Sequence, residues 1–150
     1  MWSGDDIYFM KLALEEAEKA DRLDEVPIGA VLVLDGKLVS RGHNTPIRRH
    51  DPTAHAEIQA LRSAGEWLHN YRMPESTLYV TLEPCLMCFG ALVQARVSRV
   101  VYGAPDPKVG VSQLQEVLEK VNLNHRLQWQ GGLLEDECRA VLQEFFRRRR

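Results

Sequence analysis

Residues 77–102 of the chain, TLYVTLEPCLMCFGALVQARVSRVVY, form the segment that decides the fold class. The β-branched and aromatic residues at 77–81 predict a strand. Pro84 follows, and proline is common in the first turn of a helix because its missing N–H would have no partner there. A second apolar run at 97–102 predicts another strand. A strand, a helix and a strand in succession indicate an α/β fold.

Further elements are predicted on both sides of this segment. An apolar run at 28–34 leads into Asp35-Gly36, a strong hairpin signal, so we expect the first two strands to pair antiparallel. Asp51-Pro52 is typical of a helix start, with Asp as the cap, and it follows a polar loop expected at 44–49. The remaining pattern predicts helices at 5–20, 52–68, 113–120 and 135–147 and a strand at 125–130.

Strands that alternate with helices after an opening hairpin predict a three-layer α/β/α sandwich around a mixed five-stranded sheet. The length of 150 residues suits one domain over residues 1–150. Apolar residues make up 45% and charged residues 27%, as in ordinary globular proteins. No run approaches the roughly 18 apolar residues that a membrane span needs. Residues 1–6 are acidic, unlike a secretory signal, so we expect a cytoplasmic protein with no membrane partner.

Three side chains indicate a metal site. Cys85 and Cys88 are spaced to share one face of a helix whose positive end favours thiolates, and His55 adds an imidazole. Two thiolates and an imidazole form a donor set that zinc prefers. Two other interpretations are a Cys85–Cys88 redox pair and a structural zinc site with Cys138 as fourth ligand. Cys138 fits better as a small buried residue of the last helix.

A zinc site with only three protein ligands keeps one position for water. Zinc lowers the pKa of that water to about 7, so we expect one catalytic Zn²⁺ per subunit. Glu57 is the natural proton carrier. Residues two apart inside a helix do not face the same way. Glu57 can therefore serve only if it and His55 lie at the mouth of a helix.

The motif pair His55-x-Glu57 and Pro84-Cys85-x-x-Cys88 resembles the signature of the cytidine deaminase superfamily. Within it, most of the chain resembles the bacterial tRNA-specific adenosine deaminases. The matching stretches occur in that family's order and at nearly its spacing: EVPIGAV at 25–31, Asn44, HDPTAHAE at 50–57, LYVTLEPC at 78–85, NHR at 124–126 and FFR at 145–147. The resemblance implies a cytidine deaminase-like fold and hydrolytic conversion of the wobble adenosine of a tRNA anticodon loop to inosine.

The resemblance also implies roles for individual residues. His55, Cys85 and Cys88 would hold the zinc, and Glu57 would be the catalytic acid and base. The partners would be a tRNA anticodon stem-loop and a second copy of the chain, since the family is homodimeric and holds RNA across both subunits.

Substrate contacts are implied at the base, the ribose and the phosphates. Asn44 matches the residue that hydrogen-bonds the target base or ribose, and Asp106 matches an acidic residue near the ribose. Phe146 and Arg147 match a C-terminal element that stacks on bases and contacts phosphate. The pocket walls are implied on two sides: Ile28, Gly29 and Ala56 on one, and Leu82, Glu83 and Pro84 on the other.

Other functions stay open at the level of sequence. A deaminase of a free base or nucleoside, of the guanine or cytosine type, would use the same zinc and glutamate. From another class, a non-catalytic zinc-stabilised RNA-binding subunit would be expected to lack Glu57, which is present. The net charge is −2, so RNA would need a local basic patch. The arginine run at 147–150 is such a patch or a solvated tail, and Phe89 is expected to pack in the core.

Overall fold

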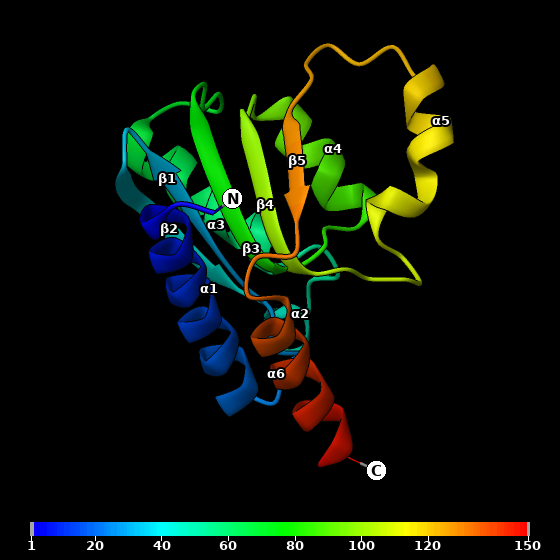
Figure 1. Ribbon diagram of the computed structural model, residues 1–150. Helices are drawn as coiled ribbons and strands as arrows, with labels where there is room; N and C mark the ends of the chain where they lie inside the picture. Colours follow the sequence, from blue (N-terminus) through cyan, green and yellow to red (C-terminus); the bar gives the residue numbers. More distant parts are fainter. Residues whose placement is uncertain (1, 150) are drawn as a thin grey trace.

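The structure, a computed structural model, describes residues 2–149 (Figure 1). Its elements follow one another in the order helix, hairpin, two helices, and then strands alternating with helices. They are α1 (Gly4–Arg22), β1 (Gly29–Leu34), β2 (Lys37–His43), α2 (Pro46–Arg49), α3 (Ala56–Leu68), β3 (Ser76–Leu82), α4 (Leu86–Gln94), β4 (Arg99–Ala104), a 3₁₀ turn (Val111–Leu114), α5 (Gln115–Lys120), β5 (Gln128–Gly131) and α6 (Glu135–Arg147).

Within residues 2–149, five strands form one mixed sheet in the order β2-β1-β3-β4-β5. β1 pairs antiparallel with β2 and β3, whereas β3, β4 and β5 run parallel. Asp35 and Gly36 both have positive φ, at 53° and 72°, which the tight hairpin turn between β1 and β2 requires. The predicted opening hairpin and mixed five-stranded sheet are therefore confirmed.

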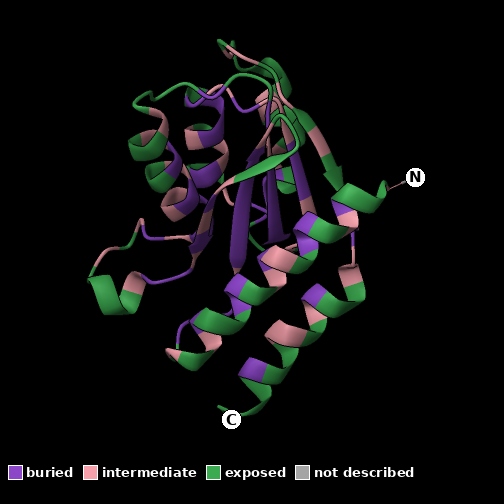
Figure 2. Ribbon diagram, turned by 90° about the vertical axis from the view of Figure 1, so that its left-hand side faces the viewer, coloured by how far each residue is buried: buried purple, intermediate pink, exposed green. Residues whose placement is uncertain are grey.

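Helices cover both faces of the sheet (Figures 1 and 2). α1 and α6 lie on one face and α3 and α4 on the other, with the buried strands between them. Alternate residues of each central strand enter opposite cores: Leu32 and Leu78 pack beneath α3, while Val31 and Tyr79 pack beneath α1. Because both faces are buried, these strands are mostly apolar, as GAVLVL in β1 shows. The predicted three-layer α/β/α sandwich is confirmed.

Two glycines allow helices to approach the sheet closely. A Cβ on Gly29 in β1 would lie 2.0 Å from the Ala13 carbonyl oxygen of α1. A Cβ on Gly42 in β2 would lie 2.3 Å from the Ala56 carbonyl oxygen, at the start of α3. The second contact seats the first turn of α3 against the sheet and so fixes the position of His55, the residue just before it.

Several predicted boundaries are wrong. The third helix begins at Ala56 and not at Pro52, because Asp51 makes a turn: its Oδ1 accepts bonds from Thr53 N–H (2.9 Å) and Thr53 Oγ1–H (2.7 Å). The loop expected at 44–49 contains the short helix α2, which has Pro46 in its first turn. Cys85 lies just outside α4 as its N-cap rather than inside the helix.

Two more boundaries differ in the second half of the chain. The helix expected at 113–120 is a 3₁₀ turn that leads into α5, and the last strand begins three residues later than expected, at Gln128. Across residues 2–149, no helix is long and apolar enough to span a membrane.

Candidate functional site

The three predicted metal ligands meet where two helices begin. His55 is the N-cap of α3, Cys85 is the N-cap of α4, and Cys88 lies in the first turn of α4. The His55 Nδ1 atom lies 3.7 Å from the Cys85 Sγ atom and 3.5 Å from the Cys88 Sγ atom. A tetrahedral ion bonded at about 2.3 Å to sulfur and about 2.0 Å to nitrogen holds such atoms about 3.5 Å apart. The group could therefore bind a metal ion.

The backbone turns these side chains toward one another. His55 (φ −73°, ψ 157°) and Cys85 (φ −79°, ψ 175°) are extended, and neither side chain caps its own helix. Their carbonyl oxygens accept bonds from the N–H groups of Gln59 and Phe89, so the backbone alone closes both first helical turns. The imidazole and the thiols are left to face a common point.

The charges at this point support metal binding. Hydrogen bonds from Cys88 and His55 lower the pKa of the Cys85 thiol to about 4. The positive end of the α4 dipole acts in the same direction. The hydrogen bond to Cys85 in turn raises the pKa of the His55 imidazole. A thiolate is the form of cysteine that binds metals, so Cys85 is prepared for an ion.

Glu57 lies in the first turn of α3 and is buried. Burial raises the pKa of Glu57 to about 7, although its own backbone N–H and the nearby His55 oppose the shift. Among the described residues, its carboxylate is not part of the three-ligand group. Because His55 is an N-cap, the two residues lie at the helix mouth, which is the arrangement that an acid–base role requires. The role itself stays a prediction.

A cavity of about 520 Å³ lies beside His55. This volume is within the range of small-molecule sites. Five residues that the sequence placed at the substrate line it together: Ile28, Asn44, Leu82, Asp106 and Phe146. They come from the start of β1, the end of β2, the end of β3, the segment after β4 and the last turns of α6. The topology thus brings distant parts of the chain to one hollow next to the candidate metal group.

Five other predicted substrate residues do not line this cavity: Gly29, Ala56, Glu83, Pro84 and Arg147. Gly29 faces α1, so contact with that helix explains its small size. Ala56 is fully buried in the core beneath α3. Arg147 is exposed and pairs with Glu144 of the same helix. Gly29 and Ala56 could therefore influence the cavity only through the residues packed between them and it.

Glu83 and Pro84 hold the segment that follows β4. The buried Glu83 carboxylate accepts bonds from the N–H groups of Asp106 (3.0 Å) and Ser112 (2.8 Å). The Pro84 carbonyl oxygen accepts a bond from the Val111 N–H. Both residues therefore act on the cavity wall from behind it.

Sequence reasoning missed several lining residues. Arg139 and Leu142 share a face of α6 with Phe146, at spacings of three and four residues. That helical spacing is the signal that could have found them. The other missed residues are the last residue of β4 and residues of the connecting segments around the cavity: Ala104, Val26, Pro105, Pro107 and Lys108.

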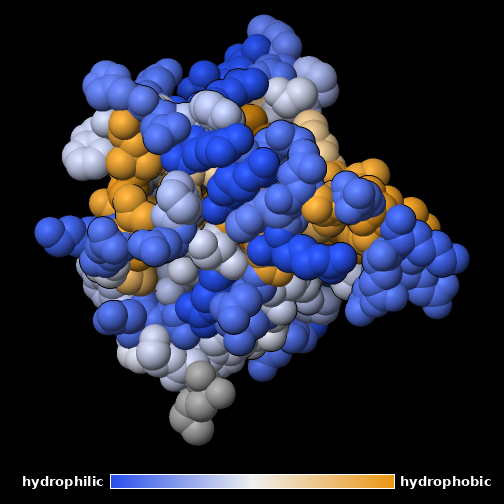
Figure 3. Space-filling view, turned by 90° about the horizontal axis from the view of Figure 1, so that it is seen from above, coloured by the Kyte–Doolittle hydropathy of each residue, from blue (hydrophilic) through white to orange (hydrophobic). Residues whose placement is uncertain are grey.

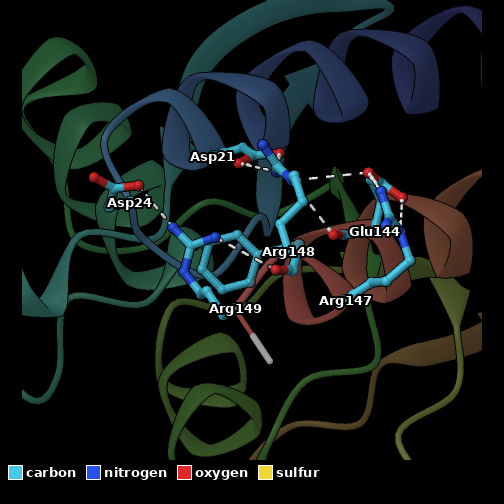
Figure 4. Close-up of polar contacts among 7 residues, drawn as sticks. Asp21, Asp24, Glu144, Arg147, Arg148 and Arg149 are labelled. Carbon is cyan, nitrogen blue, oxygen red and sulfur yellow. Dashed lines mark hydrogen bonds and ion pairs between the residues drawn. The ribbon is translucent and has the colours of Figure 1, made fainter.

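The arginine run at the C-terminus is tied to the end of α1 (Figure 4). Arg148 Nη2 lies 2.6 and 2.7 Å from the two carboxylate oxygens of Asp21. Arg149 pairs with Asp24 at 2.7 Å and stacks over the Phe145 ring at 3.6 Å. Arg148 and Arg149 therefore do not form a solvated tail, and Arg150 lies outside the described residues.

Two remaining sequence alternatives are settled by position. Cys138 is buried against β4 among the residues beneath α1, on the opposite face of the sheet from α3 and α4. It cannot complete the metal group, and its expected core position is confirmed. Phe89 does not line the cavity beside His55, but it is half-buried and outside the two core clusters; it packs edge-on against Trp129 with ring centroids 5.6 Å apart.

Comparison with known proteins gives consistent matches over nearly the whole chain. A profile of the family described as MafB19-like deaminase matches residues 4–150. The chain is 47% identical to a tRNA-specific adenosine deaminase of Haemophilus influenzae over 143 residues, which cover 94% of this chain and 83% of that protein.

Solved structures repeat the pattern. One from a study of A-to-I editing by tRNA:A34 deaminases at the wobble position of transfer RNA has a TM-score of 0.86 and 47% identity. It covers 90% of this chain and 99% of that chain. A guanine deaminase from Bacillus subtilis has a TM-score of 0.64 and 32% identity over 81% of each chain. The TM-score and the sequence identity are both higher for the tRNA-editing relative than for the guanine deaminase.

Proposed function

The chain belongs to the tRNA-specific adenosine deaminases, and on that premise we propose that it converts the wobble adenosine of a tRNA anticodon loop to inosine. The reaction is hydrolytic: water adds to C6 of adenine, and ammonia leaves, which makes the enzyme a hydrolase of a cyclic amidine C–N bond. The observation that carries the proposal is 47% identity over more than four fifths of both chains. The family profile supports one deaminase domain over residues 1–150.

One Zn²⁺ per subunit is the proposed cofactor, held by His55, Cys85 and Cys88. The support is the donor set of two thiols and an imidazole, at spacings that suit tetrahedral coordination. When bound, zinc acts as a Lewis acid that makes hydroxide available near neutral pH. No fourth protein ligand lies in the group among the described residues. That open arrangement supports a catalytic rather than a structural ion.

Glu57 is the proposed proton carrier. It takes a proton from the attacking water, delivers it to the ring nitrogen beside C6, and then assists the departure of ammonia. Its support is its place at the mouth of α3, two residues from His55, together with burial that keeps bulk water away.

The cavity beside His55 is the proposed adenosine site. Ile28 and Leu82 form apolar walls against the base, Asn44 hydrogen-bonds the base or ribose, and Asp106 lies near the ribose. Phe146 is half exposed at the cavity and offers a stacking surface for a neighbouring base. A single-stranded loop suits such a site because its bases can be turned out of the stack.

The phosphate contact proposed for Arg147 has local support. Its guanidinium is exposed one residue after Phe146, and an ion pair this exposed is weak enough for a phosphate to compete with Glu144. Lys108 at the cavity and the exposed Arg48 and Arg49 of α2 add positive charge to the same end of the molecule.

A homodimer is part of the proposal. Seen from above, apolar side chains gather where the α5 region meets the body of the molecule (Figure 3, right). The exposed apolar residues that line the hollow between α4 and the α5 region are Leu86, Val117 and Val121. We assign this surface to a second copy of the chain. Light scattering is expected to give twice 17.1 kDa for the wild type and a lower mass for Leu86→Glu/Val117→Glu. A monomeric wild type would contradict the assignment.

A free-base deaminase is the competing function, since the guanine deaminase of B. subtilis shares the fold at 32% identity. Exposed aromatic and basic side chains at the cavity favour the RNA substrate, because a free base would leave them without a partner. A cytoplasmic location follows from a transfer-RNA substrate and is proposed with it.

The chemical part is tested by replacing Glu57 with Gln. We expect wild-type zinc content and a fall in inosine formation on an anticodon stem-loop of roughly 10²- to 10⁴-fold. Glu66→Gln is the matched control, because Glu66 is exposed on the same helix. If Glu57→Gln kept full turnover, the proposed proton carrier would be wrong. If the Glu57→Gln protein formed no inosine but acted on RNA as the wild type does, that result would favour the alternative function, a non-catalytic RNA-binding subunit.

A further inference from the structure

Two buried carboxylates lie behind the cavity walls without touching the cavity. Glu25 is fully buried and Glu83 is 3% exposed, and in the described part of the chain neither forms an ion pair. Burying a carboxylate costs several kcal/mol unless hydrogen bonds replace water, so such groups are rare without a partner. Each of these two carboxylates takes its hydrogen bonds from backbone N–H groups of one short segment: the first turn of α2 for Glu25 and residues 106–112 for Glu83.

Glu25 holds the loop that carries Asn44. Its Oε1 accepts a bond from the Ile47 N–H (3.2 Å), and its Oε2 accepts one from the Arg48 N–H (2.8 Å). These donors belong to the first turn of α2, whose N-cap residue Thr45 makes no side-chain cap. A glutamate 22 residues before Ile47 thus replaces the usual local cap. Asn44, two residues before α2, lines the cavity.

Glu83 holds the opposite wall. Its two oxygens bind the N–H groups of Asp106 and Ser112, so it spans the segment that closes this side of the cavity. Gly110 completes the fit, because a Cβ there would lie 2.3 Å from the Glu83 Oε1 atom. The Asp106 side chain turns back onto the N–H groups of Lys108 and Val109, which fixes the same segment from within.

Glu25 and Glu83 use the same chemistry on opposite walls of the cavity. Each fixes one wall of a single cavity through two charge-assisted bonds, which are stronger and more directional than neutral ones. Asn44 and Thr45 are buried, and their N–H groups bond the carbonyl oxygens of Ile28 and Ala54. The two glutamates hold the more exposed parts of the walls, at 47–48 and 106–109, whose backbone would otherwise exchange readily between conformations. A shift of about 1 Å in a substrate-positioning group can cost about 100-fold in rate.

We propose that Glu25 and Glu83 are positioning residues that set the separation of the two cavity walls and thereby orient the target nucleoside. Glu25 acts through Asn44, and Glu83 acts through Asp106. Neither residue touches the substrate. The kinetic consequence rests on the proposed adenosine deamination, whereas the structural consequence can be measured without any activity.

Hydrogen exchange with mass spectrometry tests the structural consequence on the zinc-loaded protein. Glu25→Gln replaces one carboxylate oxygen with an NH₂ group, which would face a backbone N–H of α2 and could not accept its hydrogen bond. Exchange at 45–50 is expected to rise about tenfold or more, with 105–112 unchanged. Glu83→Gln is expected to give the reverse pattern. Glu16→Gln is the matched control, since Glu16 is buried but bonds the side chains of Lys19, Arg41 and His43 on α1 and β2.

Kinetics on an anticodon stem-loop tests the consequence for turnover. At equal zinc content and well below the melting temperature, Glu25→Gln and Glu83→Gln are expected to lose about tenfold or more in kcat/KM. Glu16→Gln is expected to stay within about twofold, because its wall geometry is intact. Glu25→Asp and Glu83→Asp keep the charge, but the shorter side chain moves the carboxylate away from the backbone N–H groups. If a Gln variant fails to fold, the corresponding Asp variant should show the same local rise in hydrogen exchange.

The outcomes separate this inference from the proposed function. Uniform exchange changes, or changes equal to those of Glu16→Gln, would show that the two carboxylates serve general stability only. Full turnover in both Gln variants would also overturn the inference. If the wild type is inactive on the stem-loop, the proposed function fails, and the exchange pattern alone still decides whether the two residues position the walls.

Discussion

Replacing Asp6 with Asn should weaken the attachment of α1 to the sheet. Asp6 is 6% exposed, and its carboxylate accepts bonds from Arg99 (2.8 and 3.1 Å) and from the Tyr79 hydroxyl (2.7 Å). It also completes a capping box with Ser3 at the start of α1. One side chain thus joins the first helix to β3 and β4.

The magnitude follows from what Asn cannot replace. Asn has no charge and one acceptor oxygen, and its NH₂ group would face the Arg99 guanidinium. Hydrogen bonds to charged groups contribute about 1.5–3 kcal/mol, and removing one partner of a buried pair costs about 3–5 kcal/mol. The Arg99 side chain is 24% exposed, so water recovers part of that loss. We expect about 2–3 kcal/mol, or roughly 5–10 °C in Tm for a chain of this length.

The loss should depend on pH in a defined direction. Hydrogen bonds from Arg99 hold the pKa of Asp6 well below its usual value. In the unfolded chain that pKa is about 3.9. A carboxyl with a lowered pKa in the folded state stabilises the protein above the unfolded value, and the stabilisation is lost as the pH falls below it. The difference between wild type and Asp6→Asn should therefore be constant from pH 7 to about pH 5 and shrink below about pH 4.

Urea unfolding at several pH values measures this difference. Loss of the proposed zinc in acid would affect both proteins alike, so that effect cancels when their free energies of unfolding are subtracted. Asp5→Asn is the matched control, because Asp5 is exposed in the same helical turn and should change stability by less than about 0.5 kcal/mol. A difference below about 1 kcal/mol at pH 7, or one that grows in acid, would show that the Asp6 carboxylate does not hold α1 to the sheet through its charge.

Three further changes test other parts of the structure. Gly29→Ala drives a Cβ into α1 and should cost about 1–3 kcal/mol in urea unfolding, with turnover per folded, zinc-loaded molecule retained; lost turnover at full stability would restore its pocket role. Leu78→Ala, in the core beneath α3, should cost about 2–5 kcal/mol by the same assay, and a smaller loss would show that the site collapses. Arg147→Ala should reduce the slope of log K for stem-loop binding against log salt concentration by about one, the value expected for one lost phosphate contact. An unchanged slope would argue against that contact.

The sequence predicts well those features whose cause is local. The β1–β2 hairpin depends on the positive φ values of Asp35 and Gly36, which that dipeptide favours. The candidate metal group depends on Cys85 and Cys88 being close in sequence and at the start of a helix, where thiolates are stabilised. For such features, spacing and residue type contain the physical reason.

Two kinds of feature escape the sequence. The first is competition between local structures: Asp51 looks like a helix cap, but Thr53, two residues later, bonds its oxygen and delays the helix to Ala56. The second is a contact with a remote partner. Whether Glu83 faces the cavity depends on how the segment after β4 folds over it. Arg148 lies 127 residues from its partner Asp21, so no local pattern reveals the contact. The last two outcomes are set by tertiary packing.

Adenosine deamination in transfer RNA is tested by comparing substrates. The zinc-loaded wild type would be incubated with an anticodon stem-loop bearing a wobble adenosine and, in parallel, with free adenosine, cytidine and guanine. We expect inosine in the stem-loop and no product from the free compounds. Product from a free base or nucleoside, with the stem-loop unchanged, would contradict it.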